Sequence, residues 1–387
     1  MKVPALVAAL ALFCAGPTVA QTPVKIGMIT TLTTPGGYLG EDVRDAFRLA
    51  IDEEGGRLGG VPVQLIVEDD NLKPANGKQI ADKMLQQDKV KLVTGLIFSN
   101  VAGAVAPTVL EAGAFYVSPN AGPSNFAGKD CHKNYFVASW QNDSLHESAG
   151  QAAANLGYKR MVILAPNYQA GKDALTGFKR YFKGEVLEEI YTKLDQTDFS
   201  AELARIRALK PDAVYQFHPG GQGITFVKQY VQAGLIGSTP MVVSEVSMEP
   251  RILGAVGDAA VGINVTGHWN NDFANPASQA FVKAFTTRYN RAPTPYAQQG
   301  YDTAKLIGSA LRAVGGDLAK EDAFRAALRK ADFVSTRGAF RFGSNQHPVQ
   351  DWYAFKVEKG ADGKPTIATK GKVLTNHGDA YAKDCRM

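Results

Sequence analysis

Cysteine is scarce in this chain, and an excess of charge of one sign is absent. Only three cysteines occur among 387 residues, and no CxxC pair is present. Redox chemistry and cysteine-based zinc binding are therefore not indicated. Lys and Arg together number 42 against 37 Asp and Glu, and no basic cluster occurs. Nucleic acid is consequently not an expected partner.

Catalytic signatures are also missing. The chain contains no GxSxG, GxxxxGK[ST] or HExxH motif, and its six histidines show no metal-ligand spacing. We therefore predict no catalytic residue, no metal site and no cofactor. The glycine-rich segment 219–223 lacks the third glycine of a dinucleotide fingerprint. It is either a turn that brings backbone close to a ligand or an ordinary tight turn.

A long apolar run occurs only at the N-terminus. Lys2 precedes an apolar stretch from Ala5 to Ala15, and small residues follow up to Ala20. This layout is typical of a secretory signal peptide, and the stretch is too short to span a bilayer. We predict cleavage after about Ala20 and a soluble, periplasmic product. A lipid anchor at Cys14 is the less favoured alternative, because the preceding Phe13 is too large for lipoprotein processing.

Cleavage would leave two cysteines, Cys131 and Cys385. An even number in an oxidising compartment predicts one disulfide bond between them. Two unpaired buried thiols are the alternative, since parity is weak evidence when only two cysteines are present.

Predicted strands and helices alternate along the chain in two successive runs. The first predicted helix starts at Glu41. Its apolar residues recur at helical spacing and the pair Gly55-Gly56 ends it. The first run predicts strands at 24–31, 63–68, 92–97 and 114–118, and further helices at 74–86 and 101–112. The second run predicts strands at 160–165, 186–191, 213–217, 241–243 and 261–266, and helices at 144–156, 172–181, 199–209, 224–233, 277–289 and 297–314, before short extended pieces at 339–342 and 352–357.

This alternation predicts an α/β fold with largely parallel sheets. Two successive runs indicate two similar lobes. Ligands of such sheets bind outside the carboxyl ends of the strands, so a cleft between the lobes is the expected site.

Three loops at predicted strand ends carry candidate site residues. Ser99 and Asn100 lead into a helix, where backbone N–H groups suit a carboxylate, although capping the helix is the commoner role of such residues. The segment 118–124 is either a ligand loop or a structural turn. Glu245 follows a strand of the second run and is either a partner for an ammonium group or a solvated surface charge.

At these loops the chain resembles the substrate-binding proteins of branched-chain amino acid ABC transporters, of the leucine-binding type. The resemblance extends from Val24 to about Val357. Its motifs are VKIGMITTLT at 24–33, GGRLGG at 55–60, VEDDN at 67–71, SPNAG at 118–122, FVASWQND at 136–143 and QGYDTAKLI at 299–307.

The resemblance implies two Rossmann-like lobes joined by three crossovers near Trp140, Gly267 and Gly338, which close on a ligand like a clamp. Lobe 1 would comprise 21–140 plus 268–337, and lobe 2 would comprise 141–267 plus 338–387. The implied partners are a small carboxylate ligand and the permease of an ABC importer. We expect a monomer, because the lobes must move.

The resemblance also assigns roles to individual residues. Ser99 matches the carboxylate-binding serine, Ala121 and its neighbours Asn120 and Gly122 offer backbone contacts, and Glu245 matches the ammonium-binding glutamate. Tyr168 would contact the ligand from the second lobe. His218 and Trp269 stand near positions that are often aromatic in the family.

The chain departs from the leucine-type pattern at Gly122, where those receptors have a threonine that helps hold the amino group. Phe98 and Trp269 add aromatic side chains near the expected cleft, unless both belong to the core. Two ligand classes therefore stay open, hydrophobic amino acids and aromatic acids. A ligand sensor for a membrane signalling protein and a periplasmic enzyme that uses the same cleft are the alternative functions.

Overall fold

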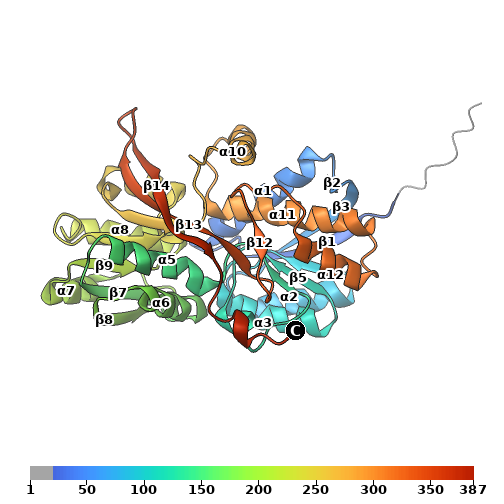
Figure 1. Ribbon diagram of the computed structural model, residues 1–387, viewed down its shortest axis with the longest axis horizontal. Coiled ribbons are helices and arrows are strands. Elements are labelled where there is room, and N and C mark those ends of the chain that lie inside the picture. Colours follow the sequence, from blue (N-terminus) through green and yellow to red (C-terminus); the bar gives the residue numbers. More distant parts are fainter. Residues whose placement is uncertain (1–20) are drawn as a thin grey trace, which may run out of the picture.

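A computed structural model describes residues 21–387. The predicted signal peptide, with its cleavage point and Cys14, lies outside the described residues. Figure 1 shows two lobes side by side, each built on its own sheet and covered by helices. The predicted α/β fold with two lobes is confirmed.

The first sheet has six strands in the order β2-β3-β1-β4-β5-β6. All its pairs are parallel except β2 with β3. The central β1 is buried on both faces, with Ile26, Met28 and Ile29 fully enclosed, as expected for a parallel sheet between helices. The strands are β1 (Val24–Thr30), β2 (Arg57–Leu58), β3 (Val61–Asp69), β4 (Leu92–Thr94), β5 (Phe115–Ser118) and β6 (Tyr135–Val137).

The second sheet has the order β12-β13-β11-β10-β9-β7-β8, and β14 pairs with β13. Its strands β7 to β11 are parallel, whereas β13 runs antiparallel to all three of its neighbours. The strands are β7 (Arg160–Pro166), β8 (Glu185–Thr192), β9 (Ala213–Gln216), β10 (Met241–Ser244), β11 (Asn264–Gly267), β12 (Arg341–Phe342), β13 (Pro348–Lys359) and β14 (Pro365–His377).

Most helices follow a strand directly and begin near its carboxyl end. The predicted apolar face of α1 is confirmed, since Val43, Ala46, Phe47, Ala50 and Ile51 are all buried. The helices are α1 (Gly37–Glu53), α2 (Pro74–Gln86), α3 (Ser99–Glu111), α4 (Ser124–Ala127), α5 (Asn142–Asn155), α6 (Gln169–Tyr181), α7 (Ser200–Leu209), α8 (Gly220–Gln232), α9 (Pro250–Val256), α10 (Pro276–Tyr289), α11 (Pro295–Val314) and α12 (Glu321–Lys330). No helix within 21–387 is both long and apolar enough to cross a bilayer.

The structure corrects several predicted elements. Helix α12 and the strands β6 and β14 were not predicted, whereas β12 lies within the extended piece predicted at 339–342. Strand β11 begins at Asn264 rather than at 261. Strand β14 escaped prediction because none of its residues is fully buried and few are apolar. Helix α8 begins at Gly220, so the glycine-rich segment forms its first turn.

A buried arginine joins two of the three segments expected to connect the lobes, those around Trp140 and Gly338. The Arg337 guanidinium donates to the backbone oxygens of Ala138 and Ser139 and pairs with Asp302. The lobe boundaries proposed from the resemblance are compatible with both sheets and stay a prediction.

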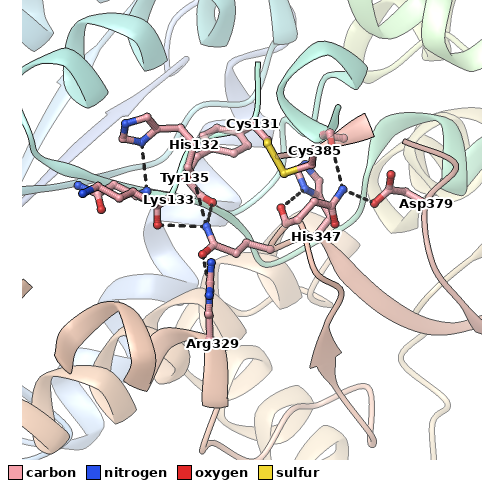
Figure 2. The surroundings of a disulfide bond; sticks show 12 residues. Cys131, His132, Lys133, Tyr135, Arg329, His347, Asp379 and Cys385 are labelled. Atoms are coloured by element: carbon pink, nitrogen blue, oxygen red, sulfur yellow. Dashed lines mark hydrogen bonds between the residues drawn. A yellow bond between two sulfur atoms is a disulfide. The ribbon is translucent and has the colours of Figure 1, made fainter. Parts of the chain in front are cut away.

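The predicted disulfide bond is present between Cys131 and Cys385 (Figure 2). Their Cα atoms are 5.6 Å apart and 254 residues separate them in sequence. Cys131 lies between α4 and β6 of the first lobe, whereas Cys385 lies beyond β14 of the second sheet. The bond therefore ties the segment after β14 back to the first lobe.

Candidate ligand site between the lobes

A buried cavity lies between the lobes, at the carboxyl ends of the parallel strands. The cavity is narrow in this arrangement of the lobes, with a volume of about 30 Å³. The first lobe and the segment around Trp140 contribute Leu39, Ile97, Phe98, Ser99, Asn120, Trp140 and Tyr296, and the second lobe contributes Asn142, Leu145, His146, Tyr168, Ala170, Phe217, Pro219 and Val246.

Six helices place a residue of their first turn, or the residue before it, in the lining of this cavity. Because the positive end of a helix dipole and the free N–H groups lie at its N-terminus, their convergence favours a negatively charged ligand. The lining residues at or next to these helix starts are Leu39 (α1), Ser99 (α3), Asn142 (α5), Tyr168 (α6), Pro219 (α8) and Tyr296 (α11).

No Asp, Glu, Lys or Arg is among the described residues that line the cavity. Burial lowers the pKa of the lining His146 to about 3, so this imidazole is neutral at ordinary pH. The positive potential for a ligand carboxylate would therefore come from the helix N-termini and not from a charged side chain. A ligand ammonium group would find no carboxylate partner, and burying an unpaired charge is costly.

Aromatic side chains form much of the wall. The rings of Phe98 and Tyr168 lie 6.4 Å apart, and those of Tyr168 and Phe217 are stacked at 6.3 Å. Trp140 and Tyr296 complete this set. Such a wall provides flat apolar surfaces on which an aromatic ring can pack.

Three uncharged polar side chains, Ser99, Asn120 and Asn142, interrupt the aromatic wall. The Asn142 amide donates to Ser99 Oγ at 3.0 Å and to Asp173 Oδ2 at 2.9 Å. Asn120 donates to the Ile97 carbonyl at 2.7 Å, while its own Oδ1 is buried without a partner in the described chain. The hydroxyl of Ser99 and the amides therefore lie where the sequence placed the carboxylate site.

Of the predicted site residues, Phe98, Ser99, Asn120 and Tyr168 line this cavity. Ala121, Gly122 and Asn100 are adjacent in sequence but do not. The N–H groups of Ala121 and Gly122 are taken by the Leu96 carbonyl and the Asn142 Oδ1.

Gly122 also has a packing reason to be glycine. A Cβ atom at this position would lie 2.1 Å from the carbonyl oxygen of Trp140. The backbone of the first crossover therefore occupies the space that a threonine side chain would need.

Glu245 is buried but its carboxylate faces the second crossover instead of the cavity. It accepts a hydrogen bond from the backbone N–H of His268 at 3.2 Å and contacts the His268 ring. The next residue, Val246, lines the cavity in its place.

His218 and Trp269 also do not line the cavity. The ring of His218 bonds to Gln216 and Thr192 and stacks on Phe226. The Trp269 indole donates to Ser278 Oγ and packs against Phe281. Both side chains belong to the second hydrophobic core, which was the alternative weighed for Trp269.

Sequence reasoning missed several lining residues, among them Trp140, Asn142, His146, Phe217 and Tyr296. Trp140 and Asn142 were noticed only as parts of a family motif. Asn142 and Tyr296 could have been found from their positions at the starts of α5 and α11. These two helices start at the same cavity as α3 and α6.

A wider and more open hollow lies beside β13 and β14. It is lined by charged side chains of both signs, including Arg341, Asp351 and Lys372. Among its lining residues only Asn275 lies next to a helix start, that of α10, and its side chain already caps that helix. Several of the charges also pair with neighbours. We therefore place the candidate site in the buried cavity. The described residues contain no group of three or more His, Cys, Asp and Glu suited to a metal ion.

Comparisons with known proteins agree with this architecture. The family model described as periplasmic binding protein matches residues 23–364. The chain is 28% identical over 353 residues to the Leu/Ile/Val-binding protein homolog 6 of Brucella melitensis, with 88% of this chain and 89% of that protein covered.

Among solved structures, an R. palustris ABC transporter solute-binding protein in complex with benzoate is 31% identical, with a TM-score of 0.89, covering 95% of this chain and all of that one. A second R. palustris solute-binding protein, in complex with 4-hydroxybenzoate, is 26% identical, with a TM-score of 0.86 and coverage of 94% and 100%. The leucine-binding protein LivK of Thermotoga maritima shares the fold at 21% identity, with a TM-score of 0.78 and coverage of 90% and 98%.

Proposed function

The chain belongs to the periplasmic binding protein family, and on that premise we propose that it binds a monocyclic aromatic carboxylate between its lobes. One observation carries the proposal. The cavity combines aromatic walls with six helix N-termini and has no acidic side chain among its described lining residues. The ring of an aromatic acid would pack on the aromatic walls, and its carboxylate would interact with the helix N-termini. The ammonium group of an amino acid would instead be buried without an acidic partner.

The carboxylate would bind at the start of α3, where Ser99 and the unpaired Asn120 Oδ1 lie close to free backbone N–H groups. A carboxylate cannot donate to Asn120 Oδ1, so we expect the Asn120 amide to reorient when the ligand enters. The ring would then pack between Phe98 and the Tyr168–Phe217 pair.

Closure of the lobes would complete the site. The lobes already contact each other through Asn142 with Ser99 and through Tyr38 with Glu249, where the hydroxyl donates at 2.9 Å. The backbone N–H of Gly221 also donates to the Pro35 carbonyl at 3.2 Å. A ligand that contacts both lobes favours this closed arrangement by its extra contacts there.

We further propose that the protein works in the periplasm and delivers its ligand to the permease of an ABC importer. The two R. palustris solute-binding proteins support this proposal, because each covers nearly the whole chain at a high TM-score. Co-purification of the tagged protein with a permease tests it, and co-purification with a membrane kinase would favour the sensor alternative.

A hydrophobic amino acid is the second candidate ligand. It is favoured by the relative from Brucella melitensis, which carries the name Leu/Ile/Val-binding protein homolog. The position of Glu245 argues against it, since its carboxylate is engaged with His268 and does not face the cavity.

Isothermal titration of residues 21–387 with benzoate, 4-hydroxybenzoate, L-leucine and L-valine tests the proposal. We expect both aromatic acids to bind, and methyl benzoate, the uncharged control, to bind at least about tenfold more weakly. Binding of leucine or valine without binding of either aromatic acid would overturn the proposal. Equal affinity for benzoate and its methyl ester would show that the helix N-termini do not recognise the charge.

A further inference from the structure

His146 lies inside the cavity and has no role in the recognition described so far. It follows Asn142 by one turn of α5, on the wall that the second lobe contributes. Its side chain is almost completely buried, with 2% of the residue exposed. Histidine is an unusual choice there, because the neighbouring lining positions Leu145 and Phe217 are apolar.

One ring nitrogen of His146 is already satisfied. Nδ1 lies 2.5 Å from the hydroxyl oxygen of Tyr215 on β9, and the imidazole packs on Phe217 with ring centres 4.7 Å apart. These two contacts fix the orientation of the imidazole. The Nε2 atom makes no hydrogen bond with any residue in the described part of the chain, and, unlike the unpartnered Nε2 of His347, it is not sealed off from the cavity.

The neutral ring leaves Nε2 able either to donate or to accept one hydrogen bond. Burial lowers the pKa of His146 to about 3, and no charged group lines the cavity to oppose this effect. In a neutral imidazole one nitrogen carries the proton and the other accepts. A hydroxyl group is the matching partner, because it can donate to or accept from Nε2 in either tautomer.

The spacing along α5 determines where that hydroxyl must be. Asn142, at the start of α5, donates to Ser99 Oγ, and His146 follows one turn later on the same face, about 5–6 Å further along. A ligand whose carboxylate lies at Ser99 therefore brings the far part of its ring close to His146. We propose that His146 Nε2 recognises a hydroxyl on the ring, at position 4 or 3 relative to the carboxylate, and makes hydroxybenzoates the preferred ligands.

This inference rests on the proposed function, since it names the substituent that the same site selects. An unsubstituted ring would leave Nε2 buried without a partner once the lobes close. Leaving a buried polar atom unpaired is costly, and sites built to bond a hydroxyl discriminate strongly against ligands that lack it.

Titration of the wild-type protein with benzoate and with 2-, 3- and 4-hydroxybenzoate is the first test. We expect the 4- or 3-hydroxy compound to bind at least about tenfold more tightly than benzoate. The His146→Leu variant should lose this preference, so that its affinities for benzoate and for the hydroxy compounds differ by less than about threefold. His146→Gln, which keeps a polar group at this depth, should retain part of the preference. His132→Leu, a histidine outside the cavity, is the matched control.

Histidine side-chain 15N NMR of the wild type keeps the test independent of how the variants fold. The Nε2 signal of His146 should shift with 4-hydroxybenzoate and not with benzoate. Equal binding of benzoate and hydroxybenzoates, a preference for the 2-hydroxy compound, or a preference that survives in His146→Leu would overturn the inference while leaving the proposed function intact. Failure of every aromatic acid to bind would instead overturn the proposed function.

Discussion

The side-chain amide of Asn142 lies 3.0 Å from the hydroxyl oxygen of Ser99, and this hydrogen bond joins the two lobes inside the candidate ligand cavity. Ser99 begins α3 on the first lobe, and Asn142 begins α5 on the second. The same amide also donates to Asp173, while its oxygen accepts from the backbone N–H of Gly122. One side chain thus connects both lobes at the point where we expect the ligand carboxylate.

Replacing Asn142 should weaken ligand binding. In Asn142→Ala the bonds to Ser99 and Asp173 are lost and the buried N–H of Gly122 has no acceptor, so the closed arrangement becomes less favourable. We expect the affinity for the aromatic acid to fall about tenfold or more, measured by isothermal titration. Asn155→Ala, an exposed asparagine on the same helix, is the control and should bind as wild type. Unchanged affinity in Asn142→Ala would show that the contact between the lobes contributes nothing to binding.

Restoring the threonine of the leucine-type receptors should not create a leucine receptor. In Gly122→Thr the new Cβ would meet the Trp140 carbonyl oxygen at 2.1 Å, so the first crossover must shift. We expect the free energy of unfolding to fall by about 1–3 kcal/mol in urea titrations, with no leucine binding gained.

Gly103 provides a matched control for this effect, because a Cβ there meets no atom within 4 Å. Gly103→Ala should stabilise the protein by up to about 1 kcal/mol, since Gly103 lies within α3, whereas Gly122→Ala should destabilise it. Leucine binding by Gly122→Thr would contradict our account of the site.

The burial of Glu249, which accepts a hydrogen bond from Tyr38, should make stability depend on pH. Burial raises the pKa of Glu249 to about 7, so the folded protein keeps this proton at pH values where the unfolded chain has released it. The raised pKa of Glu249 therefore contributes to the free energy of unfolding at low pH, and this contribution is lost as the pH rises from about 4.5 to about 7.

The lowered pKa values of His146 and His218 make the protein more stable as the pH rises, which opposes the effect of Glu249. Both histidines are present in wild type and in Glu249→Gln, so the difference between the two proteins isolates the effect of Glu249. The free energy of unfolding of the variant minus that of wild type should increase between pH 5 and pH 7, by up to about 3 kcal/mol. Urea titrations at the two pH values measure it, and Glu111→Gln, at an exposed position, is the control. A difference that stays constant or decreases with pH would contradict the prediction.

The disulfide bond should contribute substantially to stability. Cys131 and Cys385 are 254 residues apart, and closing a loop of this length reduces the entropy of the unfolded chain. We expect a loss of up to about 5 kcal/mol in the Cys131→Ser, Cys385→Ser double variant. Wild type in reducing agent should match the double variant, and the double variant itself should not respond to the reducing agent. Equal stability of all these forms would show that the bond does not restrain the unfolded chain.

The regular part of the fold could be predicted from the sequence because its signals are local. The buried face of α1 follows from the spacing of Val43, Phe47 and Ala50, and the parallel sheets follow from the alternation of strands and helices. The pairing of β14 with β13 could not be predicted this way. No residue of β14 is fully buried, so its position depends on hydrogen bonds to a partner strand rather than on its own apolar pattern.

The site was harder to predict because the direction of a side chain is not a local property. Glu245 follows a strand of the second sheet, as expected, but its carboxylate turns towards His268 and leaves Val246 at the cavity. His146 stands within a helix and gave no signal, since only the packing of α5 against Tyr215 and Phe217 brings it to the ligand side. Ser99 was found because it opens a helix directly after a strand.

The six helix starts around the cavity have a consequence for how such a receptor changes over time. The positive potential comes from main-chain groups whose positions are set by the topology of the fold. A single side-chain substitution therefore does not remove it. Substitutions at Phe98, His146 or Phe217 can therefore alter which ring is preferred without removing the attraction for a carboxylate. Acid recognition is inherited with the fold, while ring selectivity is free to diverge residue by residue.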